Sequence, residues 1–270
     1  MAHRVELEFA AKTDTGLVRS HNEDAIAISP DCGFAILADG MGGYSAGEIA
    51  SGIAIASLKQ TLELGVRIPR AGRGGQVQRL VVESILSANA AIFEAARAEP
   101  QYRGMGTTVV VALFHHQNVM VAHVGDSRAY RFRQGVLEQI TRDHSLLQEQ
   151  IDAGLISPEN ARFAQNRNLV TRALGVDRDV EVEGHDHQVE AGDLYLLCSD
   201  GLSDMLSDQE IAGILGSPLP DLQARCDALV LRANEQGGKD NISVVLVQAV
   251  TAMAGGEGDS VFDRMLNWIR

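Results

Sequence analysis

The fold is decided at Phe34-Ala35-Ile36-Leu37-Ala38-Asp39-Gly40-Met41-Gly42-Gly43, where a short apolar run ends in a carboxylate and several glycines. An apolar run bounded by turn residues predicts a buried strand over residues 34–39. The glycines allow a sharp turn and a close approach of the backbone to a ligand. Asp39 is then expected at a strand end, where an ionised carboxylate needs a cation or several hydrogen bonds. Because Asp-Gly also forms ordinary hairpin turns, the rest of the chain has to decide between a site and a turn.

The composition is that of a soluble, acidic, globular protein. The 270 residues are 45% hydrophobic and 22% charged, with a formal net charge of -13. This length suits one large domain, and the acidic surface repels phosphate backbones, so we expect no nucleic-acid partner. The three cysteines lack disulfide or zinc spacing, and no apolar run is long enough to span a bilayer. We expect a cytoplasmic monomer without membrane association.

The hydrophobic pattern predicts an α+β protein with antiparallel strands, because successive strands are joined by short links. Capping-box sequences at Ser45 and Ser207 predict helix starts. We expect a four-layer α-β-β-α sandwich, in which two antiparallel sheets are flanked by helix pairs. The expected strands are 5–11, 25–29, 34–39, 107–114, 119–124, 128–133, a short strand at 136, 193–198 and 242–247, and the expected long helices are 77–99 and 221–234, with a loop over 66–76.

Two segments lie outside this regular pattern. Residues of about 145–172 form a more polar insertion between strands, with helical pieces expected from 145 and 157, and could face a substrate. The folded domain is expected to cover 1–250, followed over 251–270 by a linker and a short amphipathic segment. That segment could pack on its own domain or dock to a partner, and its few basic residues make a membrane the weaker alternative.

Four aspartates occur beside strand ends, namely Asp39, Asp126, Asp200 and Asp240. In an antiparallel sheet the start of one strand lies next to the end of its neighbour, so Asp240 can share a rim with Asp39 and Asp200. Two carboxylates about 4 Å apart repel by roughly 4 kcal/mol at an effective dielectric constant near 20. Ligands that are all oxygen favour Mg²⁺ or Mn²⁺, and the pattern matches neither a calcium EF-hand nor a zinc site.

Such a rim has a specific chemistry. Two ions about 3.5–4 Å apart can hold a water molecule and lower its pKa, and the resulting hydroxide can attack phosphorus in line. Phosphate oxygens are bound best by a guanidinium, and Arg19, which precedes Asp24 in a glycine-containing loop, is the candidate. Each residue taken singly also fits a turn or a solvated surface, whereas their joint occurrence favours hydrolysis of a phosphate ester.

Seven segments, taken in order, resemble the motifs of the metal-dependent serine/threonine protein phosphatases of the 2C type (the PPM family), and most closely those of small bacterial members. The resemblance covers about residues 5–250. The segments are Arg19-Ser20-His21-Asn22-Glu23-Asp24, Ala38-Asp39-Gly40-Met41-Gly42-Gly43, Gly104-Met105-Gly106-Thr107-Thr108, Val124-Gly125-Asp126-Ser127-Arg128, Thr141-Arg142-Asp143-His144-Ser145, Cys198-Ser199-Asp200-Gly201-Leu202 and Asp240-Asn241-Ile242-Ser243.

The resemblance implies a set of metal ligands. Asp39, Asp200 and Asp240 would hold a first ion. Asp39 would bridge it to a second ion, which also takes the carbonyl of Gly40 and a water held by Glu23.

Further roles follow from the same resemblance. Asp24 and Asn241 would support the ligands by hydrogen bonds, Asp126 would hold a weaker third ion together with Asp200, and Arg19 would bind the substrate phosphate. Residues 145–172 would form the family's flap, which shapes substrate choice, within a catalytic domain over 1–250.

The implied function is hydrolysis of phosphoserine and phosphothreonine in proteins by a metal-bridging hydroxide, with Mn²⁺ or Mg²⁺, opposing a bacterial Ser/Thr kinase. The alternatives are a phosphoprotein-binding pseudophosphatase and a phosphatase of small phosphate esters. Met41 stands where many eukaryotic members carry a histidine proposed as general acid. His21 and His144 lie in matched motifs, but nothing in the sequence places either at the leaving oxygen, so the general acid stays unassigned.

Overall fold

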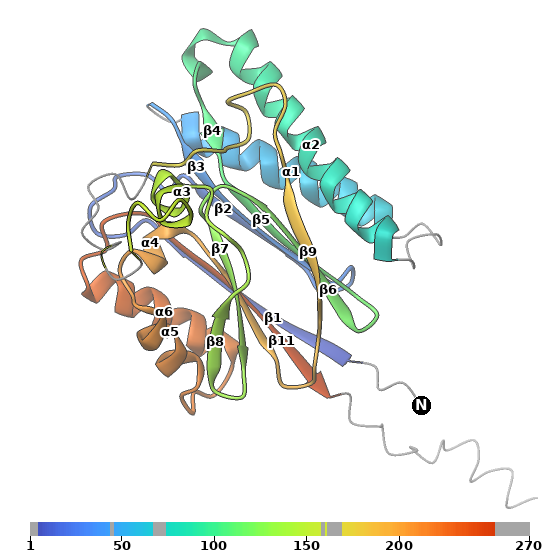
Figure 1. Cartoon of the computed structure of the whole chain (residues 1–270), viewed down its shortest axis with the longest axis vertical. Helices are drawn as coiled ribbons and strands as arrows, with labels where there is room; N and C mark the ends of the chain where they lie inside the picture. Colours follow the sequence, from blue (N-terminus) through green and yellow to red (C-terminus); the bar gives the residue numbers. More distant parts are fainter. Residues whose placement is uncertain (1–4, 44–45, 67–73, 158–159, 161–168, 252–270) are drawn as a thin grey trace, which may run out of the picture.

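Two antiparallel sheets form the centre of the protein, and helices cover their outer faces (Figure 1). The computed structural model describes residues 5–43, 46–66, 74–157, 160 and 169–251. The first sheet has the strand order β1 (Val5–Asp14), β11 (Ile242–Thr251), β10 (Leu194–Cys198), β7 (Arg128–Arg133) and β8 (Val136–Gln139). The second has the order β2 (Asp24–Ser29), β3 (Phe34–Met41), β5 (Val109–His115), β6 (Asn118–Val124) and β9 (Glu183–Gln188), with β4 (Gly106–Thr107) paired to β3.

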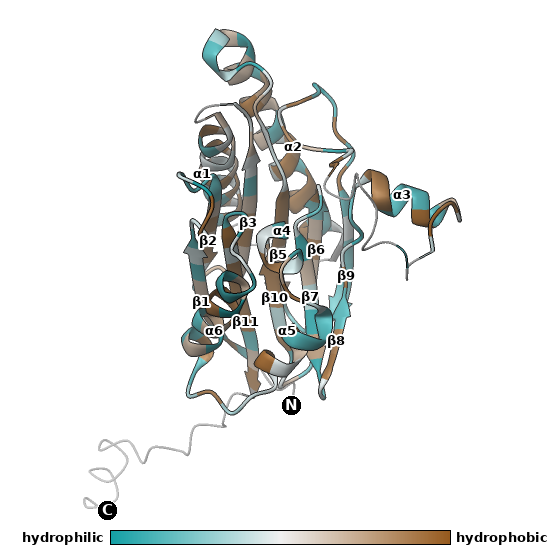
Figure 2. Cartoon of the chain, turned by 90° about the vertical axis from the view of Figure 1, so that its left-hand side faces the viewer, coloured by the Kyte–Doolittle hydropathy of each residue, from teal (hydrophilic) through white to brown (hydrophobic). Residues whose placement is uncertain are grey.

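The helices lie in two groups (Figure 1). The long helices α1 (Ala46–Val66) and α2 (Gly74–Ala98) cover the second sheet, and α2 is followed by a 3₁₀ turn over Pro100–Tyr102. The shorter helices α4 (Asp200–Ser203), α5 (Asp208–Leu215) and α6 (Leu222–Glu235) cover the first sheet. Helix α3 (Leu146–Asp152), in the insertion, projects from the body of the molecule (Figure 2). Within the described part of the chain, none of the helices combines the length and apolar character needed to cross a bilayer.

Three apolar layers between these elements confirm the predicted four-layer sandwich. Along β3 the side chains alternate, since Phe34 and Ile36 pack under α1 and α2 while Ala35 and Leu37 face the other sheet. This period-2 alternation puts both faces of the strand in apolar surroundings. Figure 2 shows the same distribution, with hydrophobic residues concentrated in the central strands.

The predicted elements are present, with differences at their ends. The predicted strand 107–114 is divided into β4 and β5 at Thr108, and the predicted loop over 66–76 is wrong at its end because α2 begins at Gly74. The capping box at Ser207 is confirmed, with both of its reciprocal hydrogen bonds formed. The predicted cap at 45, most of the helical piece from 157 and the tail 252–270 lie outside the described residues.

Strand β9 was not predicted at all. Its sequence, Glu183–Gln188, has no apolar alternation and gives no local signal of a strand. The strand exists because β6 offers it a complete edge, with six paired positions from Asn118↔Gln188 to His123↔Glu183. A solvent-facing edge strand needs only backbone pairing on one side, so its side chains can be polar.

Candidate active site

Five aspartates from distant parts of the sequence reach one rim of the sandwich. Asp39 lies near the end of β3, and Asp24 is its register partner on β2. Asp126 follows β6, Asp200 follows β10 and Asp240 precedes β11. Because all the strands are antiparallel, these positions meet at the end opposite the β2–β3 turn. The predicted convergence of carboxylates on one rim agrees with this arrangement.

The backbone of Asp39 is fixed by two threonines. Its carbonyl accepts hydrogen bonds from the backbone N–H of Thr108 (2.8 Å) and from the hydroxyl of Thr107 (2.8 Å), and its own N–H donates to Thr108 Oγ1 (3.1 Å). The next residue, Gly40, has no room for a side chain, because a Cβ there would lie 2.1 Å from the carbonyl oxygen of Gly47 in α1. The strand and the helix start therefore press together directly beside Asp39.

Asp24 connects the two sheets. Its Oδ2 accepts a hydrogen bond from the hydroxyl of Ser199 (2.8 Å), and Ser199 Oγ in turn accepts one from the backbone N–H of Ser243 on β11 (3.0 Å). The other oxygen, Oδ1, is buried and has no hydrogen-bond partner in the described part of the structure. A buried carboxylate oxygen without a donor is unfavourable unless a cation or a proton satisfies it.

Asp200 is not a strand end, as the sequence pattern suggested, but the first residue of helix α4. The strand stops at Cys198 and Ser199 is the N-cap residue. Gly201 follows, and a Cβ at this position would lie 1.9 Å from the carbonyl oxygen of Asn241. The close contact between the helix start and the chain before β11 brings Asp200 near Asp240, and burial first, then the charges of Asp126 and of neighbours that include Asp240, raise the pKa of Asp200.

Asp240 and its neighbour Asn241 hold the segment that carries Arg19 and Glu23. The guanidinium of Arg19 donates a 2.6 Å hydrogen bond to Asp240 Oδ2, and about half of the Arg19 side chain stays exposed (50%). The side-chain oxygen of Asn241 accepts the N–H of Glu23 (2.8 Å), while its amide donates to the carbonyls of Thr15 (3.0 Å) and His21 (2.8 Å). These hydrogen bonds hold the loop before β2 against the start of β11.

The carboxylates raise one another's pKa. Burial, followed by the charges of Asp24, Asp200, Asp126 and Asp240, raises the pKa of Asp39 well above its usual value. Burial raises the pKa of Asp24 to about 7 and that of Asp126 to about 6. Burial and then the charge of Asp126 raise the pKa of Asp200. A bound cation would reverse each of these shifts, because it favours the ionised form.

The residues present fit a hard divalent cation. The donor set is oxygen only, the unpartnered Oδ1 of Asp24 is buried, and the crowded carboxylates are mutually repulsive without a counter-charge. Oxygen ligands of this kind suit Mg²⁺ or Mn²⁺. The rim can therefore hold cations and, through Arg19, an anion beside them.

A groove of about 270 Å³ adjoins the rim. Its walls are Met41, which follows Gly40, the last residues of the insertion, including Val170 and Arg172, and the segment that follows the insertion, including Val176 and Glu181. A larger cavity of about 750 Å³ lies near the β2–β3 turn, at the opposite end of these strands. None of the five rim aspartates is among the described residues that line either cavity, so the site is assigned by its chemistry and not by the size of a cavity.

The structure brings the expected aspartates to the rim, with Arg19 bonded to Asp240 and Glu23 bonded to Asn241. Two residues that support them, Thr108 and Ser199, have no role assigned from the sequence. Both lie inside the motifs given above, so the sequence could have drawn attention to these positions but could not predict their hydrogen bonds. Of the two histidines left open, His21 is exposed and uses its carbonyl, and His144 is buried with its ring bonded to Gly125 and Glu183.

Known proteins resemble this chain in sequence and in fold. The family model described as protein phosphatase 2C matches residues 18–246. The serine/threonine phosphatase stp of Listeria monocytogenes is 38% identical over 240 residues, which are 88% of this chain and 94% of that protein. The serine/threonine protein phosphatase PstP of Mycobacterium tuberculosis is 38% identical over 244 residues, 90% of this chain but 45% of PstP, so the chain spans about half the length of that relative.

The structure of the PstP catalytic domain in complex with two manganese ions is also similar. It superimposes with a TM-score of 0.81 at 38% identity, covering 92% of this chain and 100% of that one. Sequence, fold and the order of the motifs agree, and the chain belongs to the protein phosphatase 2C family.

Proposed function

We propose that the protein is a serine/threonine protein phosphatase that depends on Mn²⁺ or Mg²⁺. The observation that carries the proposal is the rim of buried carboxylates with raised pKa values beside Arg19, in a chain whose relatives are named serine/threonine phosphatases. The two manganese ions of the PstP catalytic domain support an equivalent pair here.

For the ions we propose the ligands implied by the family motifs. Asp39, Asp200 and Asp240 would hold one ion, and Asp39 with the carbonyl of Gly40 would hold the second. Support for this assignment comes from the electrostatic coupling of Asp39 to Asp200 and Asp240. Glu23 would hold a water of the second ion.

Residues around these ligands would keep them in place. Asp24 would act through Ser199, and Asn241 through the backbone of Glu23, in line with their hydrogen bonds. Asp126, which also raises the pKa of Asp200, would hold a third ion with it.

The bound ions would supply the positive charge that activates a water molecule and neutralises the phosphate oxygens. Arg19 would bind the remaining phosphate oxygens, since its guanidinium sits beside Asp240 with half of its surface open to solvent. It would exchange part of its contact with Asp240 for the substrate. The general acid stays open, because Met41 has no proton to donate.

Substrates would be phosphorylated proteins rather than metabolites. The groove beside Met41 is lined by the last residues of the insertion and by the segment that follows it, and it would take the residues that flank a phosphoserine. We propose that residues 1–250 are the catalytic domain, that the flap covers about 145–172, and that 251–270 is an appended segment. We also propose that the protein is a cytoplasmic monomer and that it opposes a bacterial Ser/Thr kinase.

The test is to assay the purified chain on phosphoserine, phosphothreonine and phosphotyrosine peptides, p-nitrophenyl phosphate and small phosphate esters, with Mn²⁺, Mg²⁺ or EDTA. We expect metal-dependent release of phosphate, with kcat/KM highest for the phosphoserine and phosphothreonine peptides. Binding of the peptides without turnover would favour a pseudophosphatase, and faster hydrolysis of a metabolite would favour the small-ester alternative.

A further inference from the structure

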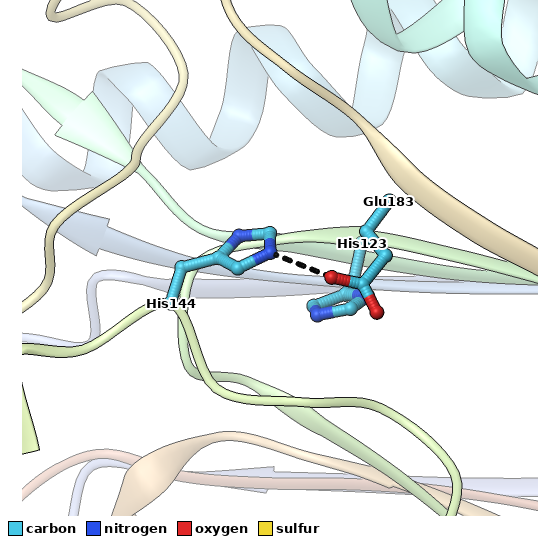
Figure 3. Close-up of side chains that lie close together, drawn as sticks. All are labelled: His123, His144 and Glu183. Atoms are coloured by element: carbon cyan, nitrogen blue, oxygen red, sulfur yellow. Dashed lines mark hydrogen bonds and ion pairs between the residues drawn. The ribbon is translucent and has the colours of Figure 1, made fainter. Parts of the chain in front are cut away.

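A second cluster of ionisable groups lies where the insertion begins. His123 on β6 and Glu183 on β9 are register partners, and His144 approaches them from the segment before α3 (Figure 3). One ligand atom from each of the three side chains lies within 4.8 Å of the others, as in a possible metal site. The two imidazoles are buried.

The ring geometry argues against a metal there. The two imidazoles are stacked, with centroids 4.6 Å apart and an angle of 18° between their planes. Imidazole lone pairs lie in the ring plane, so two stacked rings direct them along nearly parallel planes instead of towards one ion. His123 Nε2 also has a hydrogen-bond partner already, since it lies 2.7 Å from the carbonyl oxygen of Arg142.

The hydrogen bonds determine which nitrogen of His144 carries the proton. The backbone N–H of Gly125 donates to His144 Nδ1 (3.1 Å), so Nδ1 must be the acceptor and Nε2 must carry the hydrogen. Nε2 lies 3.3 Å from Glu183 Oε2 and donates to it. A metal on Nε2 would require the proton to move to Nδ1, where it would face the Gly125 N–H.

The surroundings favour this protonation state. Burial, and then the neighbouring His123, lower the pKa of His144, and burial lowers the pKa of His123 as well. Partial burial alone would raise the pKa of Glu183, but the hydrogen bond from His144 and the two nearby imidazoles outweigh it, and the pKa is lowered. The group at neutral pH is therefore a neutral imidazole that donates to a carboxylate.

His144 connects this cluster to the rim. Besides the bond to Nδ1, its backbone N–H donates to the carbonyl of Gly125 (3.0 Å), so one residue holds both sides of the glycine that precedes Asp126. Gly125 has a φ of +106°, and a Cβ there would lie 2.6 Å from Thr108 Cβ. The turn is thus enclosed between Thr108 on one side and His144 on the other.

The same residue contacts the far end of the insertion. The carbonyl of His144 accepts the N–H of Thr171 (2.8 Å), and the adjacent Ser145 forms a β-bridge with Val170. Thr171 and Val170 also line the groove beside Met41. His144 therefore contacts the Asp126 turn through its ring and its backbone N–H, and the base of the insertion through its backbone carbonyl.

We propose that His144 is a positioning residue: through its unprotonated Nδ1 it holds the Gly125–Asp126 turn, and so places the Asp126 carboxylate for cation binding while coupling it to the base of the insertion. The proposal rests on the metal-dependent function proposed above. It concerns the affinity of one cation site and not the identity of the substrate.

Two variants separate the two bonds of the ring. In His144→Asn the side-chain oxygen can take the place of Nδ1 and accept the Gly125 N–H. In His144→Gln the side-chain amide can take the place of Nε2 and donate to Glu183. The Gln variant leaves the Gly125 N–H without its acceptor. The buried N–H left unpaired is worth about a tenfold change in affinity. The matched control is His115→Gln, another largely buried imidazole, which pairs with Asp186 near the β5–β6 turn.

The primary measurement is Mn²⁺ binding by isothermal titration calorimetry, together with kcat and KM on a phosphothreonine peptide. We expect His144→Gln to weaken the lowest-affinity Mn²⁺ site about tenfold and to lower kcat with little change in KM, and His144→Asn to stay within about threefold of the parent chain. His115→Gln should match the parent. Equal Mn²⁺ affinity in the parent and His144→Gln, or equal losses in Gln and Asn, would overturn the proposal.

Two further measurements test the tautomer of His144 and the possibility of a metal site. Imidazole ¹H–¹⁵N spectra of the parent chain should show His144 with its proton on Nε2, and the opposite tautomer would contradict the proposal. One equivalent of Zn²⁺ that survives dialysis in the parent and is lost in Glu183→Gln would mean that the cluster is a metal site. An inactive parent chain would remove the proposed function, while the tautomer and the Mn²⁺ affinities would still test His144.

Discussion

The dipeptides Asp39-Gly40 and Asp200-Gly201 are alike in sequence and differ in structure. Asp39 lies within a strand, whereas Asp200 begins a helix. In each case the glycine is where a helix start and an extended segment touch. Gly40 belongs to the strand and meets the carbonyl of Gly47 in α1, while Gly201 belongs to the helix and meets the carbonyl of Asn241 before β11.

The comparison shows that the same carboxylate position can be reached from either kind of element. Asp39 is held by the strand ladder and by Thr107 and Thr108. Asp200 is held by its own short helix, with the N–H of Asp204 donating to its carbonyl (2.7 Å). What the two share is steric, since only glycine lets the backbones approach closely enough to bring the carboxylates together.

The largest expected effect is on turnover in Asp39→Asn. If Asp39 bridges two ions, as proposed, kcat should fall by at least about 100-fold, the scale at which loss of one preorganised charge affects a rate. The kcat of Asp200→Asn should also fall, but by less. Circular dichroism should show both variants folded, because each removes a repulsive charge. Activity of a tenth or more of the parent in Asp39→Asn would contradict the bridging role.

The second expected effect is on stability when either glycine gains a methyl group. A Cβ would lie 2.1 Å from backbone oxygen in Gly40→Ala and 1.9 Å in Gly201→Ala. Overpacking of this kind costs about 1–3 kcal/mol, or roughly 2–12 °C in melting temperature. Gly52→Ala in α1, where a Cβ meets nothing within 4 Å, is the matched control and should be neutral or stabilising. An unchanged melting temperature in both site variants would show that the close contacts are not required.

The third expected effect is the pH dependence of stability without metal. Asp24 and Asp126 have folded pKa values of about 7 and about 6, above the ordinary value of 3.8, so the folded state holds extra protons. Their stabilisation is present at low pH and is lost as the pH rises through these values. Thermal unfolding in EDTA should therefore give a lower melting temperature at about pH 8 than at about pH 5.

Mn²⁺ should reverse this loss. At a concentration 100 times its Kd the ion adds about 2.7 kcal/mol, or roughly 5–10 °C, and the gain should be larger at high pH because protons no longer compete. Asp39→Asn and Asp200→Asn should each flatten the pH dependence, because each removes a buried carboxyl whose own pKa is raised. The same Mn²⁺ gain at both pH values would argue against cation binding by these carboxylates.

The smallest expected effect is on substrate binding at the Asp200 and Asp240 side of the rim. Arg19 bonds to Asp240, and its pKa is raised chiefly by that bond. Arg19→Ala should raise KM for a phosphopeptide about tenfold with a smaller change in kcat. The KM of Arg19→Lys should lie between the KM values of the parent chain and of Arg19→Ala. Steady-state kinetics on one peptide gives both constants. An unchanged KM would remove Arg19 from the phosphate site.

The sequence by itself determined the family and the antiparallel α+β architecture, and it supplied the residues proposed to carry the chemistry. Apolar runs followed by Asp-Gly are local patterns, and so the strand at 34–39 and the capping box at Ser207 could be predicted from neighbouring residues alone. The convergence of Asp39, Asp200 and Asp240 also followed, because antiparallel pairing restricts where strand ends can meet.

Only the tertiary structure decided the rest. Strand β9 is polar and exists through its pairing with β6. Asp200 lies at a helix start and not at the predicted strand end, because α4 packs against the segment before β11. The bonds of Ser199 to Asp24 and of His144 to Gly125 join residues far apart in the chain. No local pattern encodes such pairs, since each bond depends on where the packing of two sheets places its donor and acceptor.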